Sequence, residues 1–396
     1  MYNSIISRFL PVFLATLSGV ALAQVTEVAS LEHNTHTGMD NSLVRVSDDT
    51  YALAYRGHGN DGWITTFTIP ADGSSITEVA SLEYDKGNGV NNSLVKMNDD
   101  TYAVAYKGPG NDGWIKTLTI SADGSSITEV ASLEHDTEQA SSNSLVKVGD
   151  DTYALAYASY HNDGFIKTFT IPADGSSITE VFSLEHDINN GVHNSLVRVI
   201  DDTYALAYRG PSNDGFIKTF TIPADGSSIT EVASLEHDTG SGSANFLVRV
   251  DDNTYALAYG GSGDDGFITT FTIPADGSSI TEVFSLEHDT DNGMANSLVR
   301  VDDDTYALAY KGLDAYGYIK TFTIPADGSS ITEVFSLEHD TEQATFNSLV
   351  RVDDDTYLLA YAGKDNDGFI KTFTIAGSNT NQPTVTSAPT VTTIED

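Results

Sequence analysis

A repeat of 51 residues is the feature that most constrains how this chain can fold. Each copy contains a Tyr-Ala-Leu-Ala-Tyr segment or a near variant of it, and no copy carries an insertion. Self-similarity at such a period is typical of solenoids and propellers, in which each repeat is one structural unit. The first tyrosine of the segment marks seven copies, at Tyr51, Tyr102, Tyr153, Tyr204, Tyr255, Tyr306 and Tyr357.

Each copy contains four short runs rich in Val, Ile, Tyr, Phe and Thr, which favour β-strands. In the third copy these runs are residues 144–148, 153–157, 165–171 and 178–186. Turns rich in Gly, Asp and Pro join the first run to the second and the third to the fourth. No helical periodicity is present. The pattern therefore predicts an all-β fold, a seven-bladed β-propeller of four-stranded antiparallel blades.

The two ends of the repeat region predict how the ring closes. The first complete run, residues 25–33, matches the fourth run of a copy, whereas the last run, residues 369–375, matches the third. The N-terminal strand can therefore pair with the last blade and complete it. Such pairing removes an open sheet edge, which would otherwise invite aggregation.

The chain is predicted to have three parts. Residues 1–23 read as a secretory signal peptide, with Arg8 before an apolar run that ends in Ala-Leu-Ala. The propeller spans residues 24–375, and residues 376–396 form a linker rich in Thr, Pro and Ser that could lead to a further domain. We therefore expect a protein that is secreted or displayed at the cell surface.

The net charge and the absence of cysteine limit the classes of partner that the protein can bind. The net charge is −38, which disfavours nucleic acid and anionic membranes, and no cysteine is present to form disulfides or thiolate metal sites. No apolar run after the signal peptide is long enough to span a membrane. We expect a monomer whose partner is a carbohydrate or an extracellular protein, with no cofactor other than possible calcium.

In its strands the sequence resembles secreted prokaryotic repeat β-propellers over residues 24–375. It is loosely similar to FG-GAP and Trp-Asp-repeat propellers, because an Asn-Asp-Gly-Phe segment is similar to part of the FG-GAP calcium loop. The alternating aspartates of that loop and the Trp-Asp dipeptide are both missing. The resemblance implies the fold and leaves the ligand open.

Variation among the seven copies collects in two sets of loops, those between the second and third runs and those between copies. In a propeller these loops share one face, which is where ring proteins commonly bind. The alternative is neutral drift in exposed loops. The candidate ligand-binding residues on this face are His36, His58, Lys86, Tyr160, His161, His193, Asp314, Tyr316 and Lys364.

A basic residue recurs in the first run of every copy, which forms the innermost strand of a blade. Seven positive charges would surround the central channel and could hold an anion or ordered water. Alternatively each base pairs with a nearby acid, such as Asp151 or Glu180 in the third copy. The predicted channel ring is Arg45, Lys96, Lys147, Arg198, Arg249, Arg300 and Arg351.

An aspartate followed by glycine precedes the third run in six copies. Calcium prefers six to eight oxygen ligands, and these loops offer carboxylates, amides and carbonyls. The alternative is an Asx turn that starts the strand. The weak metal candidates are Asp61, Asp112, Asp163, Asp214, Asp265 and Asp367.

The repetition of acidic residues in every copy argues against a single catalytic constellation, and no common hydrolase motif is present. The sequence therefore favours an extracellular adhesion module, with multivalent recognition of a carbohydrate or a cell-surface protein. A purely structural domain of a larger surface protein is the alternative. An enzyme, a hydrolase or lyase with a site on the axis, ranks third.

Overall fold

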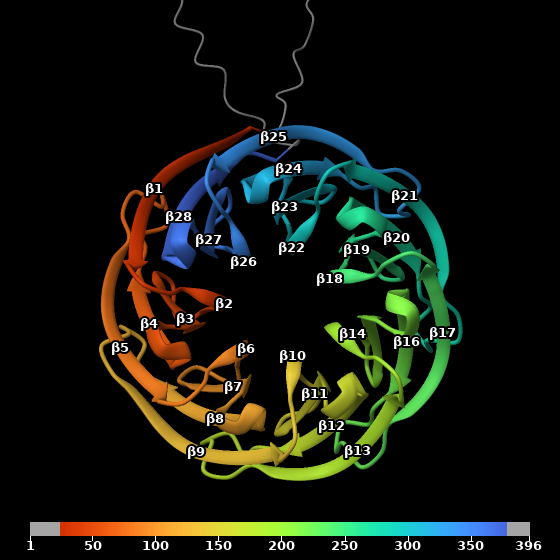
Figure 1. Ribbon diagram of the computed structural model, residues 1–396, viewed down its shortest axis with the longest axis horizontal. Coiled ribbons are helices and arrows are strands. Elements are labelled where there is room, and N and C mark those ends of the chain that lie inside the picture. Colours follow the sequence, from red (N-terminus) through yellow and green to blue (C-terminus); the bar gives the residue numbers. More distant parts are fainter. Residues whose placement is uncertain (1–23, 378–396) are drawn as a thin grey trace, which may run out of the picture.

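The computed structural model describes residues 24–377. It is a closed ring of seven four-stranded antiparallel sheets around a central channel (Figure 1). The predicted fold is confirmed. The signal peptide and all but the first residues of the linker lie outside the described residues.

The strands of each blade follow one another from the channel outward (Figure 1). The innermost strands are β2 (Met39–Arg45), β6 (Val90–Lys96), β10 (Ser141–Lys147), β14 (Val192–Ile200), β18 (Ser243–Arg249), β22 (Met294–Arg300) and β26 (Thr345–Arg351). The second strands are β3 (Thr50–Arg56), β7 (Thr101–Lys107), β11 (Thr152–Ala158), β15 (Thr203–Arg209), β19 (Thr254–Gly260), β23 (Thr305–Lys311) and β27 (Thr356–Ala362).

The third strands are β4 (Gly62–Thr68), β8 (Gly113–Ile120), β12 (Gly164–Thr170), β16 (Gly215–Thr221), β20 (Gly266–Thr272), β24 (Gly317–Thr323) and β28 (Gly368–Ile375). The outermost strands are β5 (Thr77–Asp85), β9 (Ile127–Asp136), β13 (Thr179–Asp187), β17 (Thr230–Asp238), β21 (Thr281–Asp289), β25 (Thr332–Asp340) and β1 (Val25–Asn34). A 3₁₀ turn precedes each third strand: η1 (His58–Asn60), η2 (Pro109–Asn111), η3 (Tyr160–Asn162), η4 (Pro211–Asn213), η5 (Ser262–Asp264), η6 (Leu313–Ala315) and η7 (Lys364–Asn366).

The ring closes in the seventh blade as the sequence predicts. Strand β1 pairs with β28 in antiparallel register, with Val25 opposite Ile375. The hydroxyl of Thr372 donates to the carbonyl of Gly73 in the first blade, at 2.7 Å. The two ends of the repeat region thus complete one sheet and join it to its neighbour.

The second strand explains why the blades pack face to face. In β3, Tyr51, Leu53 and Tyr55 alternate with Ala52 and Ala54, so one face of the blade is bulky and the other is flat. In each cluster of core residues, the bulky face of one blade packs on the alanine face of the preceding blade. The hydrophobic core therefore lies in the joints between blades.

Candidate functional site

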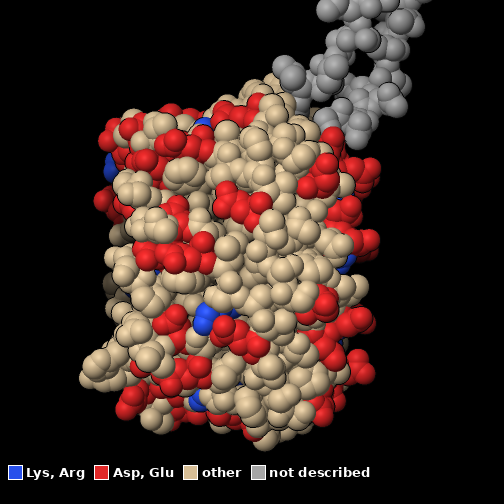
Figure 2. All heavy atoms as spheres, turned by 90° about the vertical axis from the view of Figure 1, so that its right-hand side faces the viewer, with Lys and Arg blue, Asp and Glu red and all other residues tan. Residues whose placement is uncertain are grey.

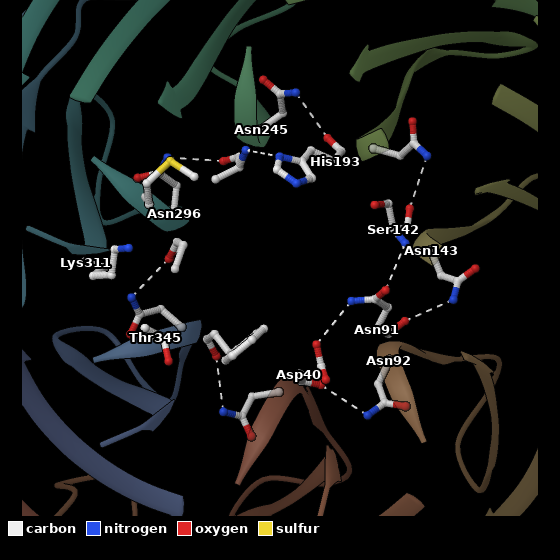
Figure 3. Close-up of a pocket in the computed structure, with 17 residues that line it drawn as sticks. Asp40, Asn91, Asn92, Ser142, Asn143, His193, Asn245, Asn296, Lys311 and Thr345 are labelled. Carbon is white, nitrogen blue, oxygen red and sulfur yellow. Dashed lines mark hydrogen bonds between the residues drawn. The ribbon is translucent and has the colours of Figure 1, made fainter. Parts of the chain in front are cut away.

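A cavity of about 430 Å³ occupies the end of the channel at which the innermost strands begin (Figure 3). Every blade contributes the same two positions to its wall. The second of these is an asparagine in all seven blades: Asn41, Asn92, Asn143, Asn194, Asn245, Asn296 and Asn347. The cavity is thus built from the part of each repeat that lies closest to the axis.

The seven asparagines link the blades into a hydrogen-bonded circle. Each side-chain Nδ2 donates to a backbone carbonyl of the preceding blade, as Asn92 does to Asp40 at 3.2 Å. Asn41 closes the circle by donating to the carbonyl of Phe346, also at 3.2 Å. The same bond is present at the other five junctions. These amides hold the rim of the cavity in a fixed shape.

The residue before each asparagine differs from blade to blade, although its backbone does not. All seven have a positive φ between 51° and 56°, a region that L-residues other than Asn and Asp adopt at a cost. A conformation that is retained whatever the side chain shows that the rim dictates the backbone. We call these residues the axial ring: Asp40, Asn91, Ser142, His193, Ala244, Ala295 and Phe346.

Among residues 24–377, Asp40 is the only acidic residue that lines the cavity. Its side chain is 2% exposed, and its Oδ2 lies 3.0 Å from Nε of Arg56. Asn91 donates to its Oδ1 at 3.2 Å. Burial raises the pKa of this carboxyl above the ordinary value, and Arg56 and Asn91 offset only part of that rise. Asp40 therefore combines a fixed position with a raised proton affinity, as a general base requires.

His193 lies in the opposite part of the ring, and its tautomer is set by a neighbour (Figure 3). The backbone N–H of Ala244 donates to its Nδ1 at 2.8 Å, so a neutral ring carries its proton on Nε2. Burial, assisted by the positive charge of Arg209, lowers the pKa of His193 to about 4. At neutral pH this side chain is an uncharged hydrogen-bond donor.

Basic residues surround the same end of the channel. The second strand of four blades ends in a base, and Lys311 lines the cavity directly. The four bases are Arg56, Lys107, Arg209 and Lys311. Viewed edge-on, the ring otherwise carries acidic side chains over both of its faces and few basic ones (Figure 2). Bases therefore gather at this end of the channel in a strongly acidic protein, while the cavity wall itself carries one base, Lys311, and one acid, Asp40.

Of the nine candidates predicted on the loop face, only His193 lines the cavity. The others lie in the outer loops around the same opening. The rings of His36 and His58 meet at 5.1 Å, and Lys364 pairs with Glu342 at 2.9 Å. Tyr160 is 55% exposed and touches the ring of its neighbour in the chain. Lys86 and Asp314 are exposed, and Tyr316 is half-buried.

The predicted channel ring lies at the other end of the innermost strands, on the face opposite the cavity opening. Its bases bind backbone carbonyls of the preceding blade more than acids. Lys147 donates to the carbonyl of Met97 at 2.9 Å, instead of pairing with Asp151 or Glu180. Four arginines, those at 45, 249, 300 and 351, also pair with an aspartate three residues on. Five of the seven bases thus tie a blade to the preceding one, whereas the hydrogen bonds of Arg198 and Arg249 go to the turn of their own blade.

Each aspartate of the predicted metal loops follows a 3₁₀ turn. In the third blade the backbone N–H of Asp163 donates to the carbonyl of Tyr160 at 3.3 Å, and its carbonyl accepts from Ser159 at 2.8 Å. Within residues 24–377 no three His, Asp or Glu side chains are grouped so that they could hold a metal ion. These backbone bonds form a 3₁₀ turn, so the Asx turn and the calcium site both stay predictions.

Sequence reasoning missed Asp40 and Lys311. The signal was present, because the position before the repeated asparagine holds Asp, Asn, Ser, His, Ala, Ala and Phe in successive copies. This variation could not be told apart from the variation of the loop residues, because a single sequence does not show which residues face the axis. The repetition of most acids drew attention away from Asp40, the one acid at its position in the seven copies.

The family described as "Lactonase, 7-bladed beta-propeller" has a sequence profile that matches residues 49–196. The match covers well under half of the chain, and it includes Asn91, Ser142 and His193 of the axial ring. No curated protein sequence matches the chain.

Three similar solved structures have the same fold at low identity. A periplasmic gluconolactonase from Pseudomonas aeruginosa is 13% identical, with a TM-score of 0.57 over 74% of this chain and 84% of that chain. A putative 6-phosphogluconolactonase from Bacteroides fragilis is 14% identical, with a TM-score of 0.59 over 81% and 90%. Another from Bacteroides uniformis is 12% identical, with a TM-score of 0.62 over 81% and 90%.

These comparisons correct the predicted function. The expectation of a non-enzymatic adhesion module that binds a carbohydrate or a cell-surface protein is wrong, because the profile that matches is that of a lactonase family. The loose likeness to FG-GAP and Trp-Asp-repeat propellers is likewise replaced by this more specific match. The error arose because sevenfold repetition was taken to exclude a unique constellation, whereas the axial ring breaks that repetition.

Proposed function

We propose that this chain is a hydrolase that opens a lactone, an intramolecular ester, in the axial cavity. The match to the lactonase profile supports the reaction class. The observation that supports the location is the axial ring, where one backbone conformation holds seven side chains of six different residue types. Chemistry that needs one base and one donor can use only such a set of unique residues.

Hydrolysis of a lactone requires a water molecule that attacks the carbonyl carbon and loses a proton. Asp40 is the group suited to accept that proton, because its carboxyl is buried in the wall and its pKa is raised. Arg56 and Asn91 hold the carboxyl in one orientation. They also balance the negative charge that the carboxylate carries before the proton is transferred.

The carbonyl oxygen of the lactone becomes negative as water adds, and it then needs hydrogen-bond donors or positive charge nearby. Lys311 supplies a positive charge at the cavity wall, and the Nε2–H of His193 supplies a neutral donor. His193 is a poor candidate for the base, because its accessible nitrogen carries a proton and its pKa is lowered to about 4. The proposed roles are therefore base for Asp40, and electrostatic or hydrogen-bond support for Lys311 and His193.

The test is hydrolysis of a panel of sugar lactones by the wild-type chain and by Asp40→Asn. We expect the substitution to lower kcat by about 10²- to 10⁴-fold, which is the usual contribution of a general base. Asp163→Asn is the matched control, because Asp163 lies in an outer turn away from the cavity. Absence of lactone hydrolysis by the wild type, or a full rate in Asp40→Asn, would contradict the proposal.

We also propose that the chain acts outside the cytoplasm. The predicted signal peptide of residues 1–23 supports export, and one similar solved structure is described as periplasmic. Within residues 24–377 no helix is long and apolar enough to cross a membrane. Expression of the full chain in a bacterium with a secretory pathway should give a product that begins at Gln24, as N-terminal sequencing of the exported fraction would determine.

A further inference from the structure

The backbone N–H groups of the axial ring are hydrogen-bonded in some blades by the side chain of the preceding ring residue. Ser142 donates its N–H to Oδ1 of Asn91 at 3.3 Å, and Ala244 donates to Nδ1 of His193 at 2.8 Å. The carboxyl of Asp40 is bonded in the same way by the backbone of Asn91. At these three junctions the side chain of one ring residue therefore accepts a hydrogen bond from the N–H of the next, whereas among the described residues no such bond joins the N–H of His193 to Ser142.

Three successive junctions lack this arrangement, those at Ala295, Phe346 and Asp40, and the first two lie in the sixth and seventh blades. The residues that precede Ala295 and Phe346 in the ring are Ala244 and Ala295, whose methyl groups accept no hydrogen bond. All seven ring residues share one φ and stand in the same irregularity of the ladder, so these two N–H groups occupy positions equivalent to those of Ser142 and Ala244. Within residues 24–377 no side-chain acceptor bonds either N–H. Both donors therefore face space that a larger side chain fills in other blades.

A positive charge lies beside these donors. Lys311 ends β23 in the sixth blade, opposite Met294 in the strand register, and it lines the cavity together with Ala295. Among the described residues, Lys311 forms no ion pair, whereas Arg56 at the equivalent position of the first blade pairs with Asp40. The sixth blade thus has the cation of the first blade without the carboxylate that accompanies it there.

The second blade shows what group fits this arrangement. The amide of Asn91 bridges two ring neighbours, since its Nδ2 donates to Asp40 and its Oδ1 accepts from Ser142 (Figure 3). A carboxylate has the same planar shape with two oxygen acceptors, and it is attracted by the lysine. Placed over Ala295, it would meet the N–H of Phe346, and it would restore the negative charge that the sixth blade lacks.

We propose that the arc formed by Ala244, Ala295, Phe346 and Lys311 is a binding site for a ligand carboxylate. This inference rests on the proposed function, because the carboxylate is the group that appears when a lactone ring is hydrolysed. The site holds the acid product with one oxygen on the N–H of Phe346 and with Lys311 as its counter-ion. The N–H of Ala295 is the second backbone donor of the arc.

The test follows the two amides directly by ¹⁵N–¹H spectroscopy of the full chain during titration with sodium gluconate. We expect downfield proton shifts of the Ala295 and Phe346 amides that neither sodium chloride at the same ionic strength nor sorbitol produces. Sorbitol has the hydroxyl groups of gluconate without the carboxylate. Equal shifts with sorbitol, or no gluconate shift at either amide, would overturn the inference.

A substitution within the ring provides the matched variant. Ala295→Asn places an Oδ1 on the N–H of Phe346, as Asn91 does for Ser142, and asparagine tolerates the positive φ of 54° better than alanine. The variant should therefore fold, and its Kd for gluconate should rise about tenfold or more. Asp163→Asn is the control, because it introduces an asparagine in an outer turn away from the cavity; its Kd should stay within about twofold.

The outcome separates this inference from the proposed function. Lactone hydrolysis by the wild type, together with a Kd for gluconate that is unchanged in Ala295→Asn, would refute the carboxylate site and leave the hydrolase intact. Gluconate binding that is lost in Ala295→Asn, without lactone hydrolysis by the wild type, would support the site and refute the reaction.

Discussion

The joints between blades and the axial ring use one repeated backbone in two different ways. In the joints the same side chains recur, so that a threonine of one blade bonds a glycine carbonyl of the next at 2.7 Å, as Thr66 bonds Gly124 and Thr168 bonds Gly226. In the axial ring the backbone recurs and the side chains change. Repeated side chains therefore hold the ring together. The axial ring, where the side chain differs from copy to copy, is the position available for chemistry.

The largest effect expected in the joints comes from removal of residues 24–34. Without β1 the seventh blade loses its outer strand, and the ring loses the pairing that closes it. The cost should exceed about 5 kcal/mol, which is comparable with the whole stability of a domain. Circular dichroism and size-exclusion chromatography should show an unfolded or aggregated product. Val28→Thr, at a residue 39% exposed in the same strand, is the control and should fold normally.

Acid should weaken the joints through six buried histidines. Burial lowers their pKa to about 3, or to about 4 for His237, from an ordinary value of 6.5. Between the folded and the unfolded pKa, the unfolded chain binds more protons than the folded chain. The free energy of unfolding is therefore undiminished by these histidines above pH 6.5, and it falls as the pH drops below that value. Each histidine contributes at most about 1.4 kcal/mol per pH unit. Urea unfolding at pH 7.5 and 5.5 measures the sum.

The outermost strand of the first blade, β5, supplies a variant that tests this explanation. Tyr84 replaces the histidine there, and its hydroxyl donates to Oδ1 of Asn92 at 2.6 Å. His135→Tyr copies that arrangement in β9 of the second blade, beside Asn143 of the third. The variant should lose less stability between pH 7.5 and 5.5 than the wild type, by up to about 1.4 kcal/mol per pH unit. Parallel losses in the two proteins would show that the buried histidine is not responsible.

A smaller effect is expected from the lysine that bridges two blades. Nζ of Lys167 donates to the carbonyl of His135 at 2.6 Å and pairs with Glu180 at 3.0 Å. Lys167→Met should cost about 1 to 3 kcal/mol, because it leaves a buried carbonyl without its donor. Lys167→Thr should cost less, since a threonine at this position of the first blade, Thr65, bonds the serine opposite it at 2.9 Å. Thermal unfolding compares the two variants.

The smallest effect is expected from calcium. The acidic loops should bind it weakly, so calcium and magnesium at equal concentration should raise Tm by similar small amounts through screening of repulsion. A large rise that only calcium produces would show that the loops of Asp61 and its equivalents form true metal sites.

The sequence predicts the scaffold well because the scaffold depends on local and repeated signals. The period, the turn residues and the displaced strand of residues 25–33 are visible in one copy or in the comparison of copies. The axial ring is not predictable in this way. The positive φ of Asp40 is imposed by the asparagine circle, and its pairing with Arg56 joins residues that the sequence alone does not place side by side.

The same limit explains the misplaced candidates. His36, His58 and Lys364 vary among the copies as Asp40 and His193 do, but they lie in the outer loops instead of on the axis. Differences among the copies at a loop position look the same as differences at an axial-ring position until the strand register is known. The register places position 40 one residue after the first pair of β2 and β3, within an irregularity of the ladder.

The most direct test of the account is a crystal structure of Asp40→Asn with a sugar lactone that the wild type hydrolyses. We expect one ligand in the axial cavity, with its carbonyl carbon within reach of a water bound to residue 40, and with His193 and Lys311 on its oxygens. Ligand bound at several equivalent positions on the outer loops, with none in the cavity, would contradict the claim that function resides where the repeat is broken.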